Sequence, residues 1–335
     1  MAVKKRGQRT LQFANPPVFL QAASIVGPKE GMGPLKPYFD QVLTDSYFNE
    51  DTWEKAESKM LEESVKILLQ KSVLTKQDID FMFAGDLLNQ NISAGFAARQ
   101  LGVPFFGLYG ACSTMYEGLI LGSILIDGGF ASKVIAAVSS HHDTAERQYR
   151  FPTELGVQRA PSAQWTVTGS AAALLADSGE GPRITHATVG KVIDLGQKDA
   201  NDMGSAMAPA AADTIATHLQ DTGRGQDYYD LIVTGDLATI GKALATKLLE
   251  KQGYSFGERY NDCGLMIYYP DQDIHAGASG CACSAVVTCG YLYSLLKSGS
   301  VKKLLGVGTG ALLSPVTANQ GESIPGIAHA VAIEM

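Results

Sequence analysis

The sequence predicts an α/β fold made of two copies of one βαβαβ unit, with two mainly parallel sheets and helices between and outside them. Two observations predict this fold. The segment IDFMFAGDL at 79–87 recurs as YDLIVTGDL at 229–237, and an Ala-Cys-Ser turn follows each copy, at 111–113 and 282–284. Continuously apolar strands that alternate with helices are typical of parallel sheets covered on both faces.

The elements of the two halves follow in the same order. In the first half we expect a strand at 79–87, a helix at 94–101, the cysteine turn, an apolar helix that ends at Gly128, and a strand at 133–138. In the second half we expect a strand at 229–237, a helix at 243–249, the cysteine turn, a helix that ends at Gly299, and a strand at 303–307. Glycine is the common residue just beyond a helix end. The turn-forming SGEGP at 178–182 places the boundary between the halves, 1–178 and 179–335, in this region.

Three further segments need an interpretation. Residues 276–296 carry no charge and are long enough to span a bilayer. Their glycines, serines and cysteines favour instead a turn followed by a buried helix. The small-residue run at 206–212 predicts a helix that begins at Pro209. His218, in a helical stretch away from any strand end, is expected to be exposed.

Composition and charge exclude several classes of protein. The chain has 335 residues, of which 45% are hydrophobic and 18% charged, and its net charge is −7. An acidic chain of this kind lacks the cationic surface that nonspecific nucleic-acid binding requires. No apolar run follows Lys4-Lys5-Arg6, so no secretory signal peptide is expected. Neither a phosphate-binding loop nor a dinucleotide fingerprint is present, so we expect no cofactor.

The cysteines are expected to be reduced and buried. There are five, an odd number, in a chain for which no secretory signal is expected. Cys281, Cys283 and His275 allow a metal site as an alternative. The single-residue spacing of the two cysteines departs from the usual C-x2-C pairs of zinc sites, which favours structural thiols and no metal.

Four features of the sequence together resemble a known superfamily. These features are the duplicated halves, the cysteine in a strand-to-helix turn, GASG at 277–280 and GVGTGA at 306–311. They are similar to the thiolase and ketoacyl-synthase superfamily, and the resemblance covers most of the chain. The strings GDLLNQN, YGACST, TAERQYRFPTE, DMGSAMAPAAADTI, NDCGLMIYYPDQD, GASGCACSAVVT and TGALLSP resemble, more narrowly, the stage V sporulation protein AD family of spore-forming bacilli.

The narrower resemblance implies a function. It implies a noncatalytic thiolase-fold protein that binds dipicolinic acid (pyridine-2,6-dicarboxylate), as the free acid or its calcium chelate, and supports uptake of that compound into the developing spore. It also implies peripheral association with the spore inner membrane and contact with other stage V sporulation A proteins. The wider superfamily pairs through its first-half sheet, which implies a homodimer.

Cys112 falls at the position of the superfamily's nucleophile. A thiol at a helix N-terminus is exposed to the partial positive charge of free N–H groups, which favours the thiolate. The same N–H groups can hold an anionic oxygen of a ligand. We therefore expect Cys112 and the adjacent Ser113 to contact a ligand. The alternative is that Cys112 is a small packing residue.

The catalytic partners of such a cysteine are not evident. Superfamily enzymes supply histidine, or histidine and asparagine, from two loops of the second half. The first of these loops has Asp236, and no histidine occurs between His218 and His275. An aspartate opposes thiolate formation by like charge and cannot replace imidazole. At the second loop His275 lies one place from the expected position. Two alternative functions therefore remain open. One is a residual acyltransferase or thiolase that uses Cys112 with His275, and the other is a ligand-free scaffold of a membrane transport complex.

A ligand with two carboxylates is expected to bind to cationic and hydroxyl-bearing residues near strand ends, because these residues can donate hydrogen bonds to the carboxylates. The further candidates for ligand contact are His141, Arg147, Arg150, Thr168, Ser279 and Gly280. Asp86 and Asp236 end equivalent strands, and the alternative to a ligand role is that each caps the helix that follows it.

Overall fold

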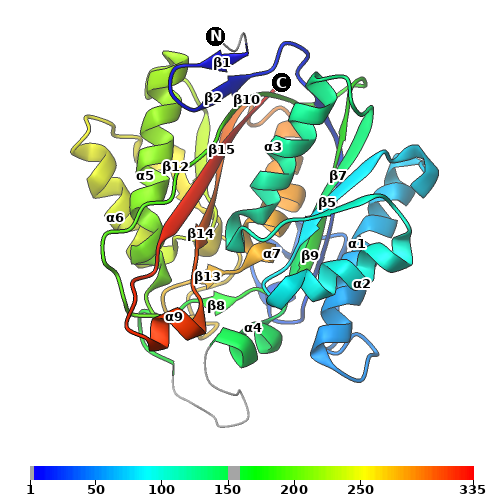
Figure 1. Cartoon of the computed structure of the whole chain (residues 1–335), viewed down its shortest axis with the longest axis horizontal. Coiled ribbons are helices and arrows are strands. Elements are labelled where there is room, and N and C mark those ends of the chain that lie inside the picture. Colours follow the sequence, from blue (N-terminus) through cyan, green and yellow to red (C-terminus); the bar gives the residue numbers. More distant parts are fainter. Residues whose placement is uncertain (1–3, 150–158) are drawn as a thin grey trace.

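The computed structural model describes residues 4–149 and 159–335, and it contains two halves with the same strand order (Figure 1). The first half contributes, in spatial order, β3 (Val18–Val26), β9 (Gly169–Ala176), β7 (Lys133–Ser140), β5 (Phe81–Gly85) and β6 (Phe105–Gly107). The second contributes β10 (Arg183–Thr188), β15 (Gly326–Glu334), β14 (Lys303–Ala311), β11 (Leu231–Thr234) and β12 (Tyr260–Asp262). The predicted duplicated α/β fold is confirmed.

The strand directions are also the same in the two halves. The outer strands β7, β5 and β6 are parallel, as are β14, β11 and β12. The inserted strands β9 and β15 run antiparallel to both of their neighbours. A single residue pair, Arg183 and Val18, joins the two sets of strands. β9 ends at Ala176 and β10 begins at Arg183, and a loop connects them. The division of the chain into 1–178 and 179–335 stays a prediction.

Short strands complete the described sheet structure. They are β1 (Lys5–Arg6), β2 (Thr10–Gln12), β4 (Gln41–Val42), β8 (Trp165–Thr166) and β13 (Ala278–Ser279). β8 and β13 pair in parallel as a separate two-stranded sheet below the main strands (Figure 1). This small sheet joins a first-half segment to a second-half segment.

The helices form three layers around these strands. They are α1 (Trp53–Ser72), α2 (Ile92–Leu101), α3 (Thr114–Asp127), α4 (His142–Tyr149), α5 (Met203–Thr222), α6 (Ala238–Glu250), α7 (Cys281–Val286), α8 (Tyr293–Lys297) and α9 (Pro315–Asn319). α3 and α7 lie between the two sets of strands, α1 and α2 cover the first set, and α5 and α6 cover the second (Figure 1). Each of the predicted repeat helices is present.

The backbone of α3 lies close to the backbone of β14, which allows α3 to pack between the halves. Tyr116 on α3 is fully buried, and its ring lies against Gly306 and Gly308 of β14. A Cβ at either glycine would come within 3 Å of the ring, so a side chain there would displace the helix. The uncharged segment 276–296 likewise folds into buried structure, as predicted. Within the described residues no helix has both the length and the apolarity to cross a membrane.

Two predictions for the second half are wrong. α5 begins at Met203, not at Pro209, because the side chain of Asp202 accepts the N–H of Ser205 and caps the helix earlier. Pro209 therefore lies inside α5. His218 is buried rather than exposed, and its ring nitrogens hydrogen-bond to the hydroxyls of Thr188 (2.8 Å) and Tyr229 (2.6 Å).

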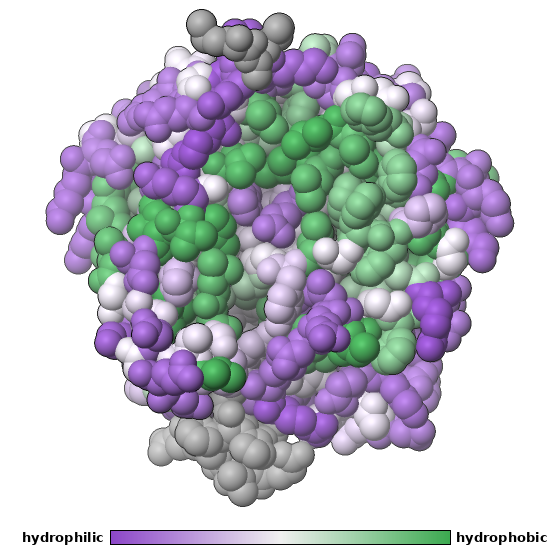
Figure 2. All heavy atoms as spheres, viewed as in Figure 1, coloured by the Kyte–Doolittle hydropathy of each residue, from purple (hydrophilic) through white to green (hydrophobic). Residues whose placement is uncertain are grey.

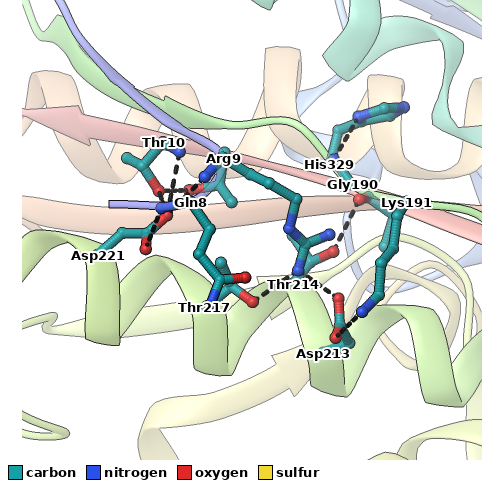
Figure 3. A network of polar contacts seen from close by, with 12 residues as sticks. Gln8, Arg9, Thr10, Gly190, Lys191, Asp213, Thr214, Thr217, Asp221 and His329 are labelled. Carbon is teal, nitrogen blue, oxygen red and sulfur yellow. Dashed lines mark hydrogen bonds and ion pairs between the residues drawn. The ribbon is translucent and has the colours of Figure 1, made fainter. Parts of the chain in front are cut away.

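The N-terminal segment is held on α5 by a polar network (Figure 3). The carboxylate of Asp221 accepts the backbone N–H groups of Gln8, Arg9 and Thr10, at 2.8, 2.9 and 3.1 Å. The Arg9 guanidinium pairs with Asp213, about two turns before Asp221 on the same helix. These contacts attach β2 to the outer layer of the second half.

Candidate functional site

A cavity lies at the carboxyl ends of the strands, between α4, α9 and the beginning of α3. Its volume is about 320 Å³, at the small end of the range for ligand pockets. The space-filling view, taken from the same side, is hollowed near its centre (Figure 2). The cavity is lined by Leu87, Asn89, Tyr109, Ala111, Cys112, Ala145, Glu146, Tyr149, Thr166, Met203, Ser279, Gly280, Ala311, Leu312, Leu313, Ser314 and Pro315.

A strained turn places Cys112 at the cavity. Ala111 has a φ of 51°, a left-handed conformation that is uncommon for a residue with a side chain. The Thr114 hydroxyl donates to the Ala111 carbonyl at 2.6 Å, and the Ser113 hydroxyl donates to the Gly110 carbonyl at 2.7 Å. These local bonds hold the turn, so Cys112 enters the cavity just before α3 begins.

Asp236 lies behind Cys112, fully buried at the end of β11. Its carboxylate accepts the Thr309 hydroxyl at 2.5 Å and the Gly280 N–H at 3.3 Å. The same carboxylate lies within hydrogen-bonding reach of the Cys112 thiol. Burial raises the pKa of Asp236 to about 7, and the hydrogen bonds from Thr309 and Cys112 partly oppose this rise.

This arrangement keeps Cys112 protonated. Burial raises the pKa of the Cys112 thiol well above its usual value, and the charge of Asp236 raises it further. The N–H of Gly280 acts in the opposite direction but has a smaller effect. A raised thiol pKa lowers the fraction of Cys112 that is present as thiolate, the nucleophilic form.

The two Gly-Asp-Leu segments have different roles. The Asp86 carboxylate accepts the N–H groups of Leu88 (2.8 Å) and Ala94 (2.7 Å), so Asp86 caps the start of α2, which is the alternative to a ligand role. Asp236 does not cap the helix that follows it. Asp262 caps α6 instead, and accepts the N–H groups of Leu237 and Ala238, both at 2.9 Å. Because Asp262 performs the capping, Asp236 is left to contact Cys112.

Only some of the candidate ligand contacts from the sequence line the described cavity. Cys112, Ser279 and Gly280 do. Asp236 lies one layer behind them, and Asp86 is engaged at the cap of α2. Ser113 is buried in its own turn.

The remaining candidates around α4 point elsewhere. The Thr168 hydroxyl accepts the N–H of His142 (3.0 Å) and does not line the cavity, whereas Thr166, two residues earlier, does. A ring nitrogen of His141 lies 2.8 Å from the carbonyl of Ser46, and burial lowers the pKa of this histidine. Both side chains support the position of α4 rather than the surface of the cavity.

The predicted arginine contacts are not among the described lining residues. Arg147 forms an ion pair with Glu54 at 3.0 Å and lies over the Trp53 ring, beside a neighbouring cavity. Arg150 lies outside the described residues. Among the described lining residues Glu146 is the only one with a formal charge at neutral pH. The described cavity wall therefore offers a diacid neutral donors rather than cations.

His275 lies away from Cys112 on a loop. One ring nitrogen is 2.8 Å from the Ala160 carbonyl, and the other is 3.3 Å from the Asp273 carboxylate. It is not among the residues that line the cavity, and none of the described lining residues is a histidine.

Several residues that line the cavity were not predicted from the sequence. Tyr109 precedes the cysteine turn, and Tyr149 ends α4. Leu312, Leu313 and Ser314 connect β14 to α9. Tyr109 and the 312–314 loop follow strands, so a search of every strand end would have found them. No sequence signal marks Tyr149, because its place depends on the direction in which α4 leaves β7.

Comparison with known proteins identifies the family. A model of the family described as "Stage V sporulation protein AD (SpoVAD)" matches residues 7–334. The chain belongs to the stage V sporulation protein AD family. Stage V sporulation protein AD of Bacillus subtilis (strain 168) is 49% identical to it over 332 residues, which cover 99% of this chain and 98% of that protein.

Solved structures show that the fold of this sporulation protein AD family member is thiolase-like. It is similar to OleA from Xanthomonas campestris, with a TM-score of 0.63, 13% identity, and 98% of this chain and 100% of that chain covered. It is also similar to 3-oxoacyl-[acyl-carrier-protein] synthase III from Aquifex aeolicus VF5, with a TM-score of 0.56, 13% identity, and 95% and 100% of the two chains covered. At such identities the likeness concerns the fold alone.

Proposed function

We propose that this protein is a noncatalytic binding protein for dipicolinic acid, and that it supports uptake of this compound into the developing spore. The observation that carries the proposal is the pairing of Cys112 with the buried Asp236 at the wall of a small cavity. An acyl-transfer enzyme needs a nucleophile in its ionised form and a base to accept the proton. Here the group beside the thiol is an acid that disfavours ionisation.

The shape and surface of the cavity support a single-ring ligand. The cavity is small, and most of its described wall is apolar, with aliphatic side chains from Leu87, Met203 and the 312–313 loop. Such a wall can pack against the faces of a flat ring, while polar groups at its edges fix the orientation of the ligand. The family resemblance supplies the identity of the ligand, pyridine-2,6-dicarboxylate.

An acyltransferase that uses Cys112 with His275 is the alternative function. The position of His275, bonded to the Ala160 carbonyl outside the cavity, argues against it. Incubation with an acyl-CoA followed by mass measurement distinguishes the two functions. A Cys112 adduct that forms and turns over would contradict the binding-only proposal.

Calorimetric titration with dipicolinate tests the binding proposal directly. We expect saturable binding by the folded protein, and the same titration with equimolar calcium tells whether the chelate is also bound. Cys112→Leu should weaken binding because the larger side chain fills part of the cavity. Val316→Leu is the matched control, since Val316 is 66% exposed on α9 and does not line the cavity. Absence of binding at millimolar ligand would refute the proposal.

We also propose that the protein is a homodimer that pairs through the first half. β6 is an edge strand, with β5 as its one strand neighbour among the described residues. Phe106 on this strand is 50% exposed, and Phe130, in the loop between α3 and β7, is 74% exposed. Figure 2 shows hydrophobic side chains gathered over α3 on this face. Antiparallel pairing of β6 with a second copy across a twofold axis would satisfy the strand edge and bury these groups.

The proposed place of action is the developing spore. The protein would associate with the inner membrane from outside the bilayer, through other stage V sporulation A proteins. Membrane fractionation of sporulating cells that contain or lack those proteins tests this. Retention of the chain on membranes in their absence would contradict it.

A further inference from the structure

Two tyrosine hydroxyls meet at the cavity from different parts of the chain. Tyr109 follows β6, Tyr149 ends α4, and their hydroxyl oxygens are 3.3 Å apart. The Tyr109 hydroxyl is also 3.4 Å from the carbonyl of Leu87. Both distances are long for O–H···O hydrogen bonds, which centre near 2.7–2.8 Å. The two phenols therefore form weak mutual bonds that a stronger acceptor could replace.

A second pair of hydroxyls comes from the small two-stranded sheet. Thr166 of β8 and Ser279 of β13 are register partners, so they lie side by side, and both line the cavity. They are 6% and 5% exposed. Within the described part of the chain neither hydroxyl has a hydrogen-bond partner. Nearly buried hydroxyls that face a cavity without a partner are suited to a polar group of a ligand.

The described wall of this cavity offers a carboxylate donors that are not cationic. The one formally charged residue in the described lining is the acid Glu146. A buried carboxylate must be hydrogen-bonded to offset its lost hydration, and O–H donors to an anion form short, strong bonds. Burial raises the pKa of Tyr149 far above its usual value, so its hydroxyl remains a donor at physiological pH.

We propose that the two hydroxyl pairs, Tyr109 with Tyr149 and Thr166 with Ser279, each bind one carboxylate of a planar aromatic diacid whose ring lies between them. This inference rests on the proposed function and adds the residues that recognise its ligand. The described part of the site would hold the two carboxylates through paired neutral hydroxyls.

The test compares dipicolinate with picolinate, which has the same ring and one carboxylate fewer. Calorimetry is run on the wild type, on the double variant Tyr109→Phe/Tyr149→Phe, and on the double variant Thr166→Val/Ser279→Ala. These changes remove hydroxyls and keep side-chain shape. Tyr269→Phe is the control, because Tyr269 is 49% exposed and lies outside the cavity.

We expect each double variant to lose about tenfold or more in dipicolinate affinity. Picolinate affinity should change by only about twofold, because one intact pair still binds its single carboxylate. The preference of the wild type for dipicolinate should therefore shrink in both variants. If the wild type binds dipicolinate and both variants keep its affinity and preference, the inference is wrong while the proposed function stands. If the wild type binds neither ligand, the proposed function fails and this inference fails with it.

Discussion

Replacing Asp236 with asparagine should make the Cys112 thiol easier to ionise. In the wild type the Asp236 carboxylate lies within hydrogen-bonding reach of the thiol, and both groups are buried. Burial raises the pKa of Asp236 to about 7, and the anionic form of this carboxyl opposes formation of a second anion at Cys112. Asparagine has nearly the same shape and can still accept from Thr309 or Gly280, but it has no charge.

The size of the effect follows from the like-charge contribution to the pKa of the thiol. A charge in direct contact shifts a pKa by roughly one to three units, and each unit is a tenfold change in the ionised fraction. Alkylation of Cys112 by iodoacetamide at pH 7.5 should therefore be about tenfold faster, or more, in the variant. Intact mass and peptide mapping give the rate and the site.

The control is Asp86→Asn, which neutralises the equivalent strand-end carboxyl of the first half. Asp86 caps α2 and is not among the groups that set the pKa of Cys112. Circular dichroism confirms that each protein remains folded during the reaction. Equal alkylation rates in Asp236→Asn and the wild type would refute the account of how the thiol is kept protonated.

Three further predictions concern stability and assembly. Burial raises the pKa of Glu57 to about 8 from an ordinary 4.5, so the stability it contributes is complete below the ordinary value and is lost as the pH rises through 8. The melting temperature measured at pH 6, 7 and 8 should thus fall less with rising pH for Glu57→Gln than for the wild type. An equal fall of the melting temperature in both proteins would contradict this. Asp221→Ala should lower the free energy of unfolding, measured by urea denaturation, by about 1–3 kcal/mol, because three backbone N–H groups lose their acceptor. An unchanged denaturation midpoint would argue that these contacts do not hold the N-terminal segment on α5. Phe106→Asp should convert the dimer to monomer in sedimentation velocity, whereas a wild type that is already monomeric would exclude the proposed dimer.

The repeat was the strongest signal in the sequence, and it predicted the fold well. Apolar strands ending in Gly-Asp-Leu and helices ending at Gly128 and Gly299 are local patterns, so their structure could be predicted without tertiary information. The start of α5 could not be predicted as well, because the cap at Asp202 competes with the more conspicuous Pro209. The burial of His218 could not be predicted because its two hydrogen-bond partners, Thr188 and Tyr229, lie on other elements of the fold.

The candidate site was only partly predictable for the same reason. Cys112, Ser279 and Gly280 follow from strand-to-helix turns, and all three line the cavity. The roles of Asp86 and Asp236 could not be told apart from two identical Gly-Asp-Leu strings. Asp262 lies 26 residues after Asp236 and takes over the cap of α6, which only the folded chain reveals.

A structure determined after soaking crystals with dipicolinate tests the central proposal most directly. We predict a pyridine ring in the cavity beside Cys112, with one carboxylate at Tyr109 and Tyr149 and the other at Thr166 and Ser279. A ligand bound elsewhere on the protein, or an empty cavity at saturating ligand, would contradict the account.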